Sequence, residues 1–206
     1  ASSVLLRDAS RATPGVYTAT ATDGTQTASV TWQVYAGSGR QARNVILFVG
    51  DGMTVANVTA ARILSRGIRE GRYDGRLTID DFPAMATIGT SGVDSIATDS
   101  ANSAAAYNTG HKSAVNALNV YPSRAADTLA HPRVETLSSI VQRSRGMSVG
   151  VVTNTEIQDA TPAAVFAHTR RRSDYIPITD QMLDSGVDVL MGGGSASLLP
   201  RSVAGS

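Results

Sequence analysis

The chain has 206 residues, enough to bury a sizeable core as one large domain or as one domain and part of another. Its 18 lysines and arginines balance its 17 aspartates and glutamates, so net charge does not indicate nucleic acid or an anionic membrane surface as a partner. The absence of cysteine excludes disulfides, zinc–cysteine sites and thiol catalysis.

The first residues give no sign of a membrane segment. Residues 1–4 lack the charged-then-apolar pattern of a signal peptide. No apolar run in the chain approaches the roughly 20 residues that a membrane-spanning helix needs. We therefore expect a soluble chain that has already been processed.

Residues 15–36 predict a β-hairpin. They alternate β-branched or aromatic residues with small or polar ones on both sides of the turn signal Asp23-Gly24. An isolated two-stranded ribbon is marginal in water, so the hairpin either packs on the main body or ends a β-sandwich domain, and the second interpretation is slightly favoured. The Gly- and Ser-rich residues 37–41 predict a linker. We therefore expect a β segment over 1–41 and a new domain over 42–206.

From residue 42 onward, predicted strands and helices alternate. Strands are predicted at 44–49, 84–90, 148–153 and 187–191, and helices at 54–66, 100–109, 133–144, 162–171 and 178–185. This alternation is typical of an α/β domain with a largely parallel sheet and helices on both faces. Because ligands collect beyond the carboxyl ends of such strands, Asp51 is expected at that edge, directly after the first strand.

A serine lies beside a carboxylate in the run Ala97-Thr98-Asp99-Ser100-Ala101-Asn102-Ser103-Ala104, where a helix of small residues can begin. The N-terminus of a helix presents unpaired N–H groups and a partial positive charge, which stabilise a phosphate or a serine alkoxide. The same residue types are also ordinary N-caps, so simple capping is the alternative for this motif alone.

A second polar turn is formed by Asp159-Ala160-Thr161-Pro162. It offers a carboxylate and a hydroxyl from one turn, and such oxygen ligands suit a hard cation such as Mg²⁺. The alternative is that Asp159 only caps the following helix, with Pro162 in its first turn.

Three motifs occur together and in order. They are Gly50-Asp51-Gly52-Met53, Thr98-Asp99-Ser100-Ala101 with Ser103, and Gln158-Asp159-Ala160-Thr161-Pro162-Ala163 followed by Ala167-His168 and Arg172. From about residue 44 to residue 194 the chain resembles the alkaline phosphatase family. The resemblance implies an alkaline phosphatase-like fold, of which 42–206 is the N-terminal part of the catalytic domain, and hydrolysis of phosphate monoesters to inorganic phosphate.

Displacement at a phosphate monoester needs an in-line nucleophile, positive charge around the equatorial oxygens, and metal ions on the attacking and leaving oxygens. Serine is a weak nucleophile at neutral pH without such help. By the resemblance, Ser100 is phosphorylated in turnover and contacts a metal ion, and metal-bound hydroxide then hydrolyses the phosphoserine. The family binds two Zn²⁺ and one Mg²⁺. Asp51 would bridge a zinc and the magnesium, and Asp159 and Thr161 would bind the magnesium.

The resemblance also implies that Arg172 grips two phosphate oxygens, a role that suits the planar guanidinium fork, and that Asp99 orients Arg172. The family's spacing from Asp159 and its spacing from His168 both select Arg172 among the three adjacent arginines. A charge run usually lies on a solvated face, so we expect Arg170 and Arg171 to do so.

The histidines are not expected to bind zinc. His111, His131 and His168 have no metal-ligand spacing to one another, and His168 is expected on the apolar side of a helix as a packed, hydrogen-bonded residue.

The chain departs from the family in length. By the resemblance, most zinc ligands and one magnesium ligand come from the second half of the catalytic domain. We therefore expect the isolated chain to bind zinc weakly and to catalyse poorly. Our hypothesis is the N-terminal product of a nicked alkaline phosphatase, with the C-terminal fragment bound as a second chain. A homodimer and a periplasmic or secreted location follow from the resemblance alone.

Alternative functions stay open. Within the superfamily the chain could be a phosphodiesterase, although diesterases generally use threonine as the nucleophile, or a sulfatase, which has a different motif. Outside it, the chain could be a truncated, non-catalytic phosphate-binding or structural module. A conventional serine hydrolase is disfavoured, because the sequence has no Gly-X-Ser-X-Gly elbow.

Overall fold

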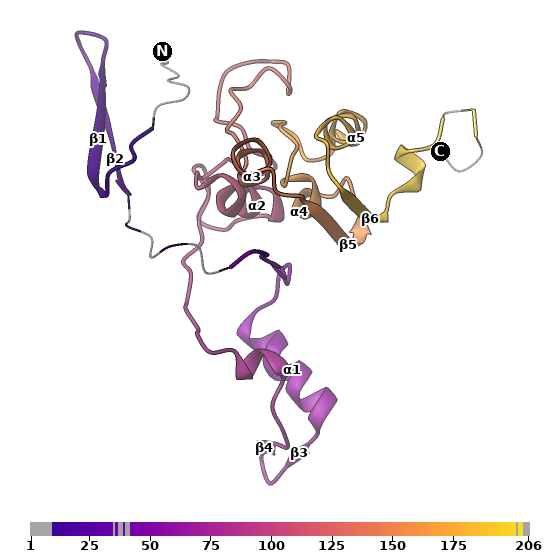
Figure 1. Ribbon diagram of the computed structural model, residues 1–206. Helices are drawn as coiled ribbons and strands as arrows, with labels where there is room; N and C mark the ends of the chain where they lie inside the picture. The colour runs from indigo at the N-terminus through magenta and orange to yellow at the C-terminus, as the bar shows by residue number, and fades with distance from the viewer. Residues whose placement is uncertain (1–9, 35, 37–38, 40–41, 201, 204–206) are drawn as a thin grey trace. The chain divides into compact units, whose positions relative to one another are not determined.

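The computed structural model describes residues 10–34, 36, 39, 42–200 and 202–203 (Figure 1). The chain divides into two compact units, Ala1–Val49 and Gly50–Ser206. No helix in the described residues is long and apolar enough to cross a membrane.

The predicted hairpin is confirmed. Strand β1, Gly15–Thr22, pairs antiparallel with β2, Thr27–Val34 (Figure 1). At the turn, Asp23 Oδ1 accepts hydrogen bonds from the backbone N–H groups of Thr25 and Gln26, at 2.9 and 2.7 Å. Both strands are largely exposed. Membership of a sandwich domain stays a prediction.

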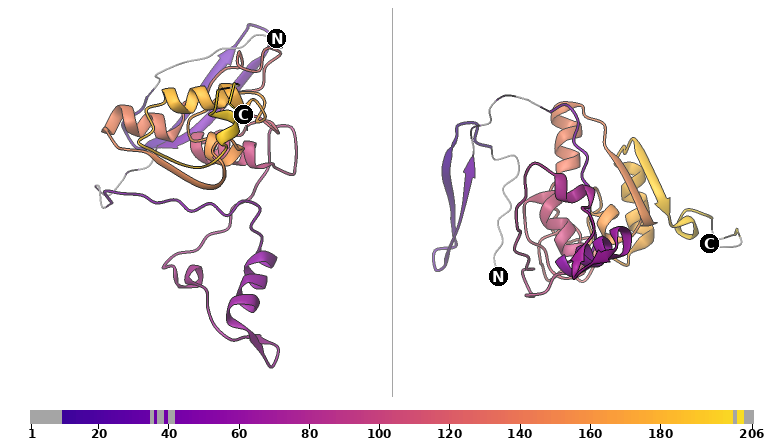
Figure 2. Two further views of the ribbon diagram at one scale, coloured as in Figure 1. Left: turned by 90° about the vertical axis from the view of Figure 1, so that its right-hand side faces the viewer. Right: turned by 90° about the horizontal axis from the view of Figure 1, so that it is seen from below.

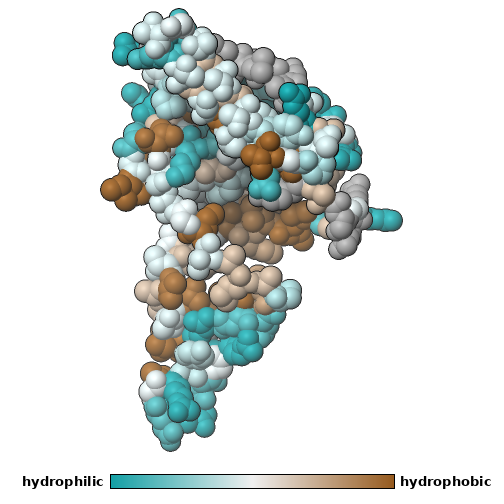
Figure 3. Space-filling model, turned by 90° about the vertical axis from the view of Figure 1, so that its left-hand side faces the viewer, coloured by the Kyte–Doolittle hydropathy of each residue, from teal (hydrophilic) through white to brown (hydrophobic). Residues whose placement is uncertain are grey.

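Two predicted strands are wrong. Residues 44–49 and 84–90 form no strand, and their apolar side chains are exposed, with Phe48 at 87 % and Ile88 at 86 %. A strand forms only where a neighbour supplies hydrogen bonds to its backbone. Neither run pairs with another strand of the described chain. In the second unit, hydrophobic side chains therefore remain at the surface (Figure 3).

The predicted helix at 54–66 is confirmed as α1, Val55–Arg66, which Thr54 caps. A small hairpin that the sequence did not reveal follows, with β3 at Ile68–Arg69 and β4 at Arg72–Tyr73. The short 3₁₀ helix η1 is Thr78–Asp81. Arg62 ties α1 to η1, because its Nε donates to Asp80 Oδ2 at 2.9 Å. None of the side chains in α1 is buried.

The elements from α2 onward contain the buried side chains. They are α2 (Ser100–Thr109), α3 (Leu137–Arg145), β5 (Gly150–Glu156), α4 (Ala160–Ala163), α5 (Tyr175–Asp184), β6 (Val189–Gly193) and the 3₁₀ helix η2 (Ser195–Ser197). Helix α2 has the predicted bounds, and the predictions of α3, α5, β5 and β6 are confirmed with shifted ends.

The predicted helix at 162–171 is wrong. Helix α4 ends at Ala163. Local turns continue to Ala167, whose N–H donates to the carbonyl of Ala163 at 2.7 Å, and the chain then bonds to distant segments. Thr169 exchanges two backbone hydrogen bonds with Leu118, at 2.8 and 3.1 Å. The backbone N–H of Arg170 donates to the carbonyl of Thr128 at 2.9 Å.

Strands β5 and β6 are parallel, with Val151 opposite Leu190. Each sheet in the described residues has two strands. A largely parallel sheet is therefore not confirmed.

The core is built from small side chains. Buried alanines of α2 and of the α4 region pack with Leu118, Ile178 and Met182. The alanines are Ala101, Ala104, Ala160, Ala163, Ala164 and Ala167. The elements that carry them lie together in each view (Figures 1 and 2). Because alanine lets backbones approach closely, the beginnings of α2 and α4 lie near each other, and both carry predicted site residues.

Candidate active site around Ser100

Ser100 is the first residue of α2, at the positive end of the helix. The start of the helix is fixed by a reciprocal cap. Asp99 Oδ1 accepts from the backbone N–H of Asn102, and Asn102 Oδ1 accepts from that of Asp99, both at 3.0 Å. The helix ends at Gly110, whose φ of 73° lies in the left-handed region. The local sequence alone therefore places Ser100 where anions are stabilised.

Arg172 joins three predicted site residues. Its Nη1 donates to Ser100 Oγ at 3.0 Å and lies 3.3 Å from Asp99 Oδ2. Its Nη2 donates to Asp159 Oδ1 at 2.7 Å. The expected ion pair with Asp99 is present, whereas the ion pair with Asp159 was not foreseen from the sequence.

Asn116 is a structural member of the site that sequence reasoning missed. Its backbone N–H donates to Asp99 Oδ2 at 3.1 Å, and its carbonyl accepts from the backbone N–H of Arg172 at 2.8 Å. Its φ of 65° is left-handed, a conformation that asparagine tolerates better than most residues. An asparagine in a loop was the only signal available beforehand.

The electrostatics keep Arg172 charged. Burial acts to lower its pKa, but hydrogen bonding and charge attraction from Asp159, and then from Asp99, outweigh burial, so the pKa is raised. The guanidinium side chain is 26 % exposed. Two carboxylates, those of Asp99 and Asp159, contact this one guanidinium beside Ser100. A phosphate dianion placed among them therefore calls for additional cations.

Asp51 lies in the turn before α1, and its Oδ2 accepts a hydrogen bond from Thr161 Oγ1 at 2.8 Å. Burial and, second, the negative charge of Asp51 raise the pKa of Tyr107, which places this phenol near the same carboxylate. Asp51 and Thr161 thus offer two adjacent oxygens, a donor type that suits a hard cation.

Asp159 is engaged differently from Thr161. Besides Arg172, its Oδ1 accepts from the backbone N–H of Ala160 at 2.7 Å, so it caps α4. Among the described residues, no group of three or more His, Asp or Glu side chains is positioned to hold a metal ion. The side chains present therefore fit part of a magnesium site, and in the described chain they do not assemble a four-coordinate zinc site.

The histidines have other partners. His168 lies in the loop after α4 rather than on a helix, which corrects its expected setting, and its Nε2 is 2.8 Å from the carbonyl of Val134. Burial, the largest effect, lowers its pKa. His131 is buried, with Nδ1 3.1 Å from Ser123 Oγ and Nε2 3.2 Å from the carbonyl of Ala125.

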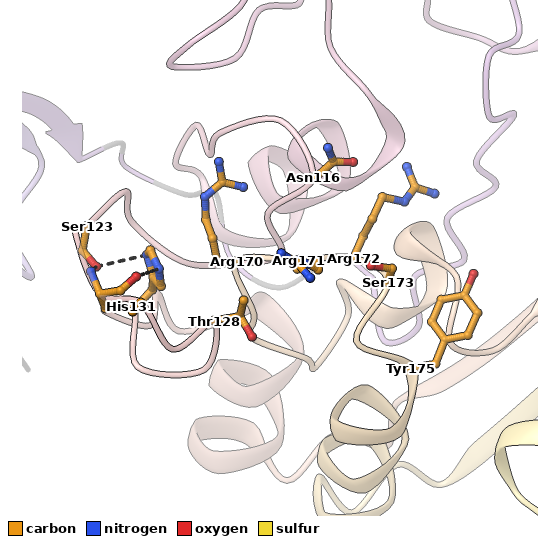
Figure 4. A pocket seen from close by; sticks show the side chains of 11 residues that line it. Asn116, Ser123, Thr128, His131, Arg170, Arg171, Arg172, Ser173 and Tyr175 are labelled. Carbon is orange, nitrogen blue, oxygen red and sulfur yellow. Dashed lines mark hydrogen bonds between the residues drawn. The ribbon is translucent and has the colours of Figure 1, made fainter.

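A hollow of about 790 Å³ adjoins this cluster, and three consecutive arginines, Arg170 to Arg172, line part of it (Figure 4). Arg170 is not on a solvated face, contrary to expectation. It is half-buried, and its Nη1 donates to the carbonyl of Val115 at 2.8 Å. Arg171 is exposed, as expected.

A family model described as "Alkaline phosphatase" matches residues 42–205. The chain belongs to the alkaline phosphatase family. Two curated relatives are the tissue-nonspecific isozyme of alkaline phosphatase from Gallus gallus and an alkaline phosphatase from Gadus morhua. Each is 33% identical over 79% of this chain, covering 35% and 38% of the relative. The chain therefore spans about a third of the length of the curated relatives that it matches.

Solved alkaline phosphatases have similar folds. The enzyme from Thermus thermophilus aligns with a TM-score of 0.66 at 27% identity, over 82% of this chain and 34% of the other. A cold-active alkaline phosphatase from Shewanella sp. aligns with a TM-score of 0.62 at 31% identity, over 76% of this chain and 37% of the other. These neighbours are consistent with an α/β alkaline phosphatase-like fold. A TAB5 alkaline phosphatase mutant with Mg bound aligns with a TM-score of 0.56 at 28% identity, over 67% and 37% of the two chains.

Proposed function

We propose that this chain contributes the nucleophile and the phosphate-binding arginine of a metal-dependent enzyme that hydrolyses phosphate monoesters. The observation that carries the proposal is the Arg172 guanidinium, which contacts Ser100 Oγ and is held between Asp99 and Asp159 at the N-terminus of α2. Membership of the alkaline phosphatase family supports the same reaction.

In the proposed reaction, Ser100 Oγ attacks phosphorus, the bond between phosphorus and the ester oxygen breaks, and the alcohol leaves with a proton. Water then attacks the phosphoserine and releases inorganic phosphate, which regenerates the serine. The N-terminal N–H groups of α2 would stabilise the developing negative charge on Oγ and the phosphoryl oxygens.

Arg172 would bind two phosphoryl oxygens through its fork of donors. Asp99 and Asp159 would fix the orientation of the guanidinium, because each accepts from a different terminal nitrogen. The raised pKa of Arg172 keeps this cation charged at the alkaline pH at which a serine alkoxide forms more readily.

Of this chain's residues, Asp51, Thr161, Asp159 and Ser100 would hold metal ions: magnesium at Asp51, Thr161 and Asp159, and zinc at Asp51 and Ser100. Two Zn²⁺ and one Mg²⁺, when bound, would supply Lewis acidity and would offset the negative charge of the Asp99 and Asp159 carboxylates beside Ser100. The contact between Asp51 and Thr161 at 2.8 Å supports the oxygen-donor part of this assignment.

We also propose that a C-terminal portion of the same protein, carried on a second chain, supplies the remaining zinc ligands. The family resemblance supports this, because by that resemblance most zinc ligands come from the second half of the catalytic domain. A homodimer and a periplasmic or secreted location are further proposals that rest on the family resemblance. Native mass spectrometry of the purified protein tests the second chain and the homodimer, because it would show a companion chain or a second copy.

The test is hydrolysis of p-nitrophenyl phosphate by the native preparation with added Zn²⁺ and Mg²⁺. Ser100→Ala should abolish hydrolysis, because the nucleophile is lost. Ser103→Ala is the matched control on the same helix, where the hydroxyl donates to the backbone carbonyl of Asp99, and it should keep most of the activity. Equal activities in the two variants would refute Ser100 as the nucleophile. Faster hydrolysis of bis(p-nitrophenyl) phosphate would favour a phosphodiesterase.

A second candidate is a non-catalytic phosphate-binding module, in which Arg172 and the N-terminus of α2 would bind the anion. In that case phosphate would bind, and Arg172→Ala would abolish its binding, while the native preparation with both metals would show no turnover. Calorimetric titration with inorganic phosphate beside the hydrolysis assay separates the two functions.

A further inference from the structure

We propose that the hollow beside the Ser100 cluster binds a second phosphoryl group, so that the preferred substrates are phosphate monoesters that carry another phosphate. Arg170 is the main contact. This inference rests on the proposed function of Ser100 and Arg172, because it places the second phosphate relative to theirs.

Arg170 is held in position near that site. Its Nη1 donates to the carbonyl of Val115 at 2.8 Å. The next residue, Asn116, donates its backbone N–H to Asp99 and accepts from the backbone N–H of Arg172. The guanidinium of Arg170 is therefore anchored one residue away from the segment that binds both Asp99 and Arg172.

Most of the donors of Arg170 remain available for a ligand. A guanidinium has five N–H donors, and the carbonyl of Val115 takes one of them. Arg172 forms two ion pairs, with Asp99 and Asp159, whereas Arg170 forms none with the carboxylates of the described residues. A half-buried guanidinium without a carboxylate partner is a strong binding group for a phosphoryl group, because the planar fork matches two phosphate oxygens.

The lining of the hollow is positive overall. It includes three arginines and no aspartate or glutamate (Figure 4). The nearby carboxylate of Asp174 binds two hydroxyl groups rather than Arg170. Its Oδ2 accepts hydrogen bonds from Thr128 Oγ1 at 2.7 Å and from Thr169 Oγ1 at 2.8 Å. With a volume of about 790 Å³, the hollow has room for a phosphoryl group.

A purely structural role for Arg170 predicts different behaviour. If the contact with Val115 only fastened two loops together, losing Arg170 would weaken folding and would change the binding of every anion alike. A subsite predicts that the loss falls selectively on ligands with two phosphoryl groups.

The experiment measures anion binding by calorimetry on the native preparation with Zn²⁺ and Mg²⁺ at fixed ionic strength, and every protein in it also carries Ser100→Ala so that the probes are not hydrolysed. The probes are inorganic phosphate, pyrophosphate, and the bisphosphate of 1,3-propanediol, whose two phosphates are separated by a carbon chain. The variants are Arg170→Gln, Arg170→Lys and the matched control Arg145→Gln, which removes one exposed arginine from the last turn of α3. Circular dichroism shows whether each variant folds.

We expect the protein with Arg170 intact to bind pyrophosphate or the propanediol bisphosphate about tenfold or more tightly than it binds phosphate. That factor is what one charge-assisted contact provides. Arg170→Gln should reduce this preference to about threefold or less while leaving phosphate affinity unchanged. Arg170→Lys, which keeps the charge but not the fork, should retain part of the preference, and Arg145→Gln all of it. Pyrophosphate carries more charge than phosphate at any site, so the contrast between Arg170→Gln and Arg145→Gln is decisive.

Two results would overturn the proposal. One is that the protein with Arg170 intact binds neither pyrophosphate nor the propanediol bisphosphate more tightly than phosphate. The other is that Arg170→Gln and Arg145→Gln show the same preference for these probes over phosphate. If Arg170→Gln fails to fold, Arg170→Lys is the deciding variant. An unchanged preference for the two-phosphate probes in Arg170→Lys would overturn the specific role of the guanidinium fork. Because every protein in this assay carries Ser100→Ala, the binding result does not depend on Ser100 as a nucleophile, and failure of that role would appear separately as hydrolysis that persists in the Ser100→Ala variant.

Discussion

The two halves of the larger unit bury their side chains to very different extents. In the described chain, every buried residue lies at or beyond Ala101. Residues 50–96 contribute none, and large apolar side chains such as Ile96, at 92 % exposure, remain in contact with solvent.

This difference divides the proposed site. Ser100, Asp159 and Arg172 belong to the packed half, where alanine packing and backbone hydrogen bonds fix their positions. Asp51 belongs to the unpacked half, and its carboxylate accepts a hydrogen bond from Thr161. The groups proposed to bind phosphate are thus preorganised, whereas the position of Asp51, a proposed metal ligand, depends on few contacts.

The largest expected effect contrasts one leucine from each half. Leu118→Ala should lower the free energy of unfolding by about 2–5 kcal/mol, because this side chain is fully buried and its loss leaves a cavity. Leu64→Ala should cost about 0.5 kcal/mol or less, because Leu64 is 86 % exposed on α1. Urea denaturation followed by circular dichroism measures both. Equal costs would show that residues 50–96 are packed in solution.

The next contrast uses the two capping boxes. Asp99→Ala should cost about 2 kcal/mol, because it removes the cap of α2 and an acceptor of Arg172. Thr54→Ala, at the equivalent position of α1, should cost about 1 kcal/mol or less. Thermal unfolding compares the two. Asp99→Asn, which keeps the cap, should recover part of the loss, and no recovery would show that the ion pair dominates.

A smaller effect is expected at the end of α2. Gly110→Ala should cost about 1 kcal/mol, because φ is 73° there and an alanine is strained in that conformation even though its Cβ would meet open space. Gly110→Asn should cost less, because asparagine tolerates the left-handed region. Denaturation midpoints of the two variants give the order. The reverse order would mean that contacts, rather than backbone strain, decide this position.

The smallest effect is a pH dependence within the packed half. Burial lowers the pKa of His168, so the unfolded chain binds more protons than the folded one just below the unfolded pKa of about 6.5. Stability should therefore fall as the pH drops below that value and be fully present above it. His168→Gln should flatten this part of the stability profile. A profile that is unchanged by the substitution would contradict the lowered pKa.

Local signals allowed the packed half to be predicted from the sequence better than the rest. The cap at Asp99 and the stop at Gly110 define α2 without help from distant residues, so Ser100 could be placed correctly. The apolar run at 44–49 looked like a strand, but a strand depends on a partner, and the described chain provides none.

Contacts between distant segments limited the prediction of the site. The bridge between Leu118 and Thr169 diverts the chain within the span expected to be helical, and no short sequence window contains both residues of that bridge. The bond between Arg172 and Asp159 likewise depends on how α2 and α4 pack. For this reason the sequence indicated Arg172 through the family resemblance, whereas the contacts of Asn116 and Arg170 emerged only in three dimensions.

Peptide mass spectrometry tests most directly whether Ser100 accepts a phosphoryl group. The native preparation, with Zn²⁺ and Mg²⁺, is mixed with a phosphate monoester, quenched in acid and digested. If Ser100 is the nucleophile, it carries a phosphate adduct that is absent in Arg172→Ala, because the groups that hold the phosphoryl oxygens are then incomplete. Substrate turnover with no adduct on Ser100, or with an adduct on another residue, would contradict that role.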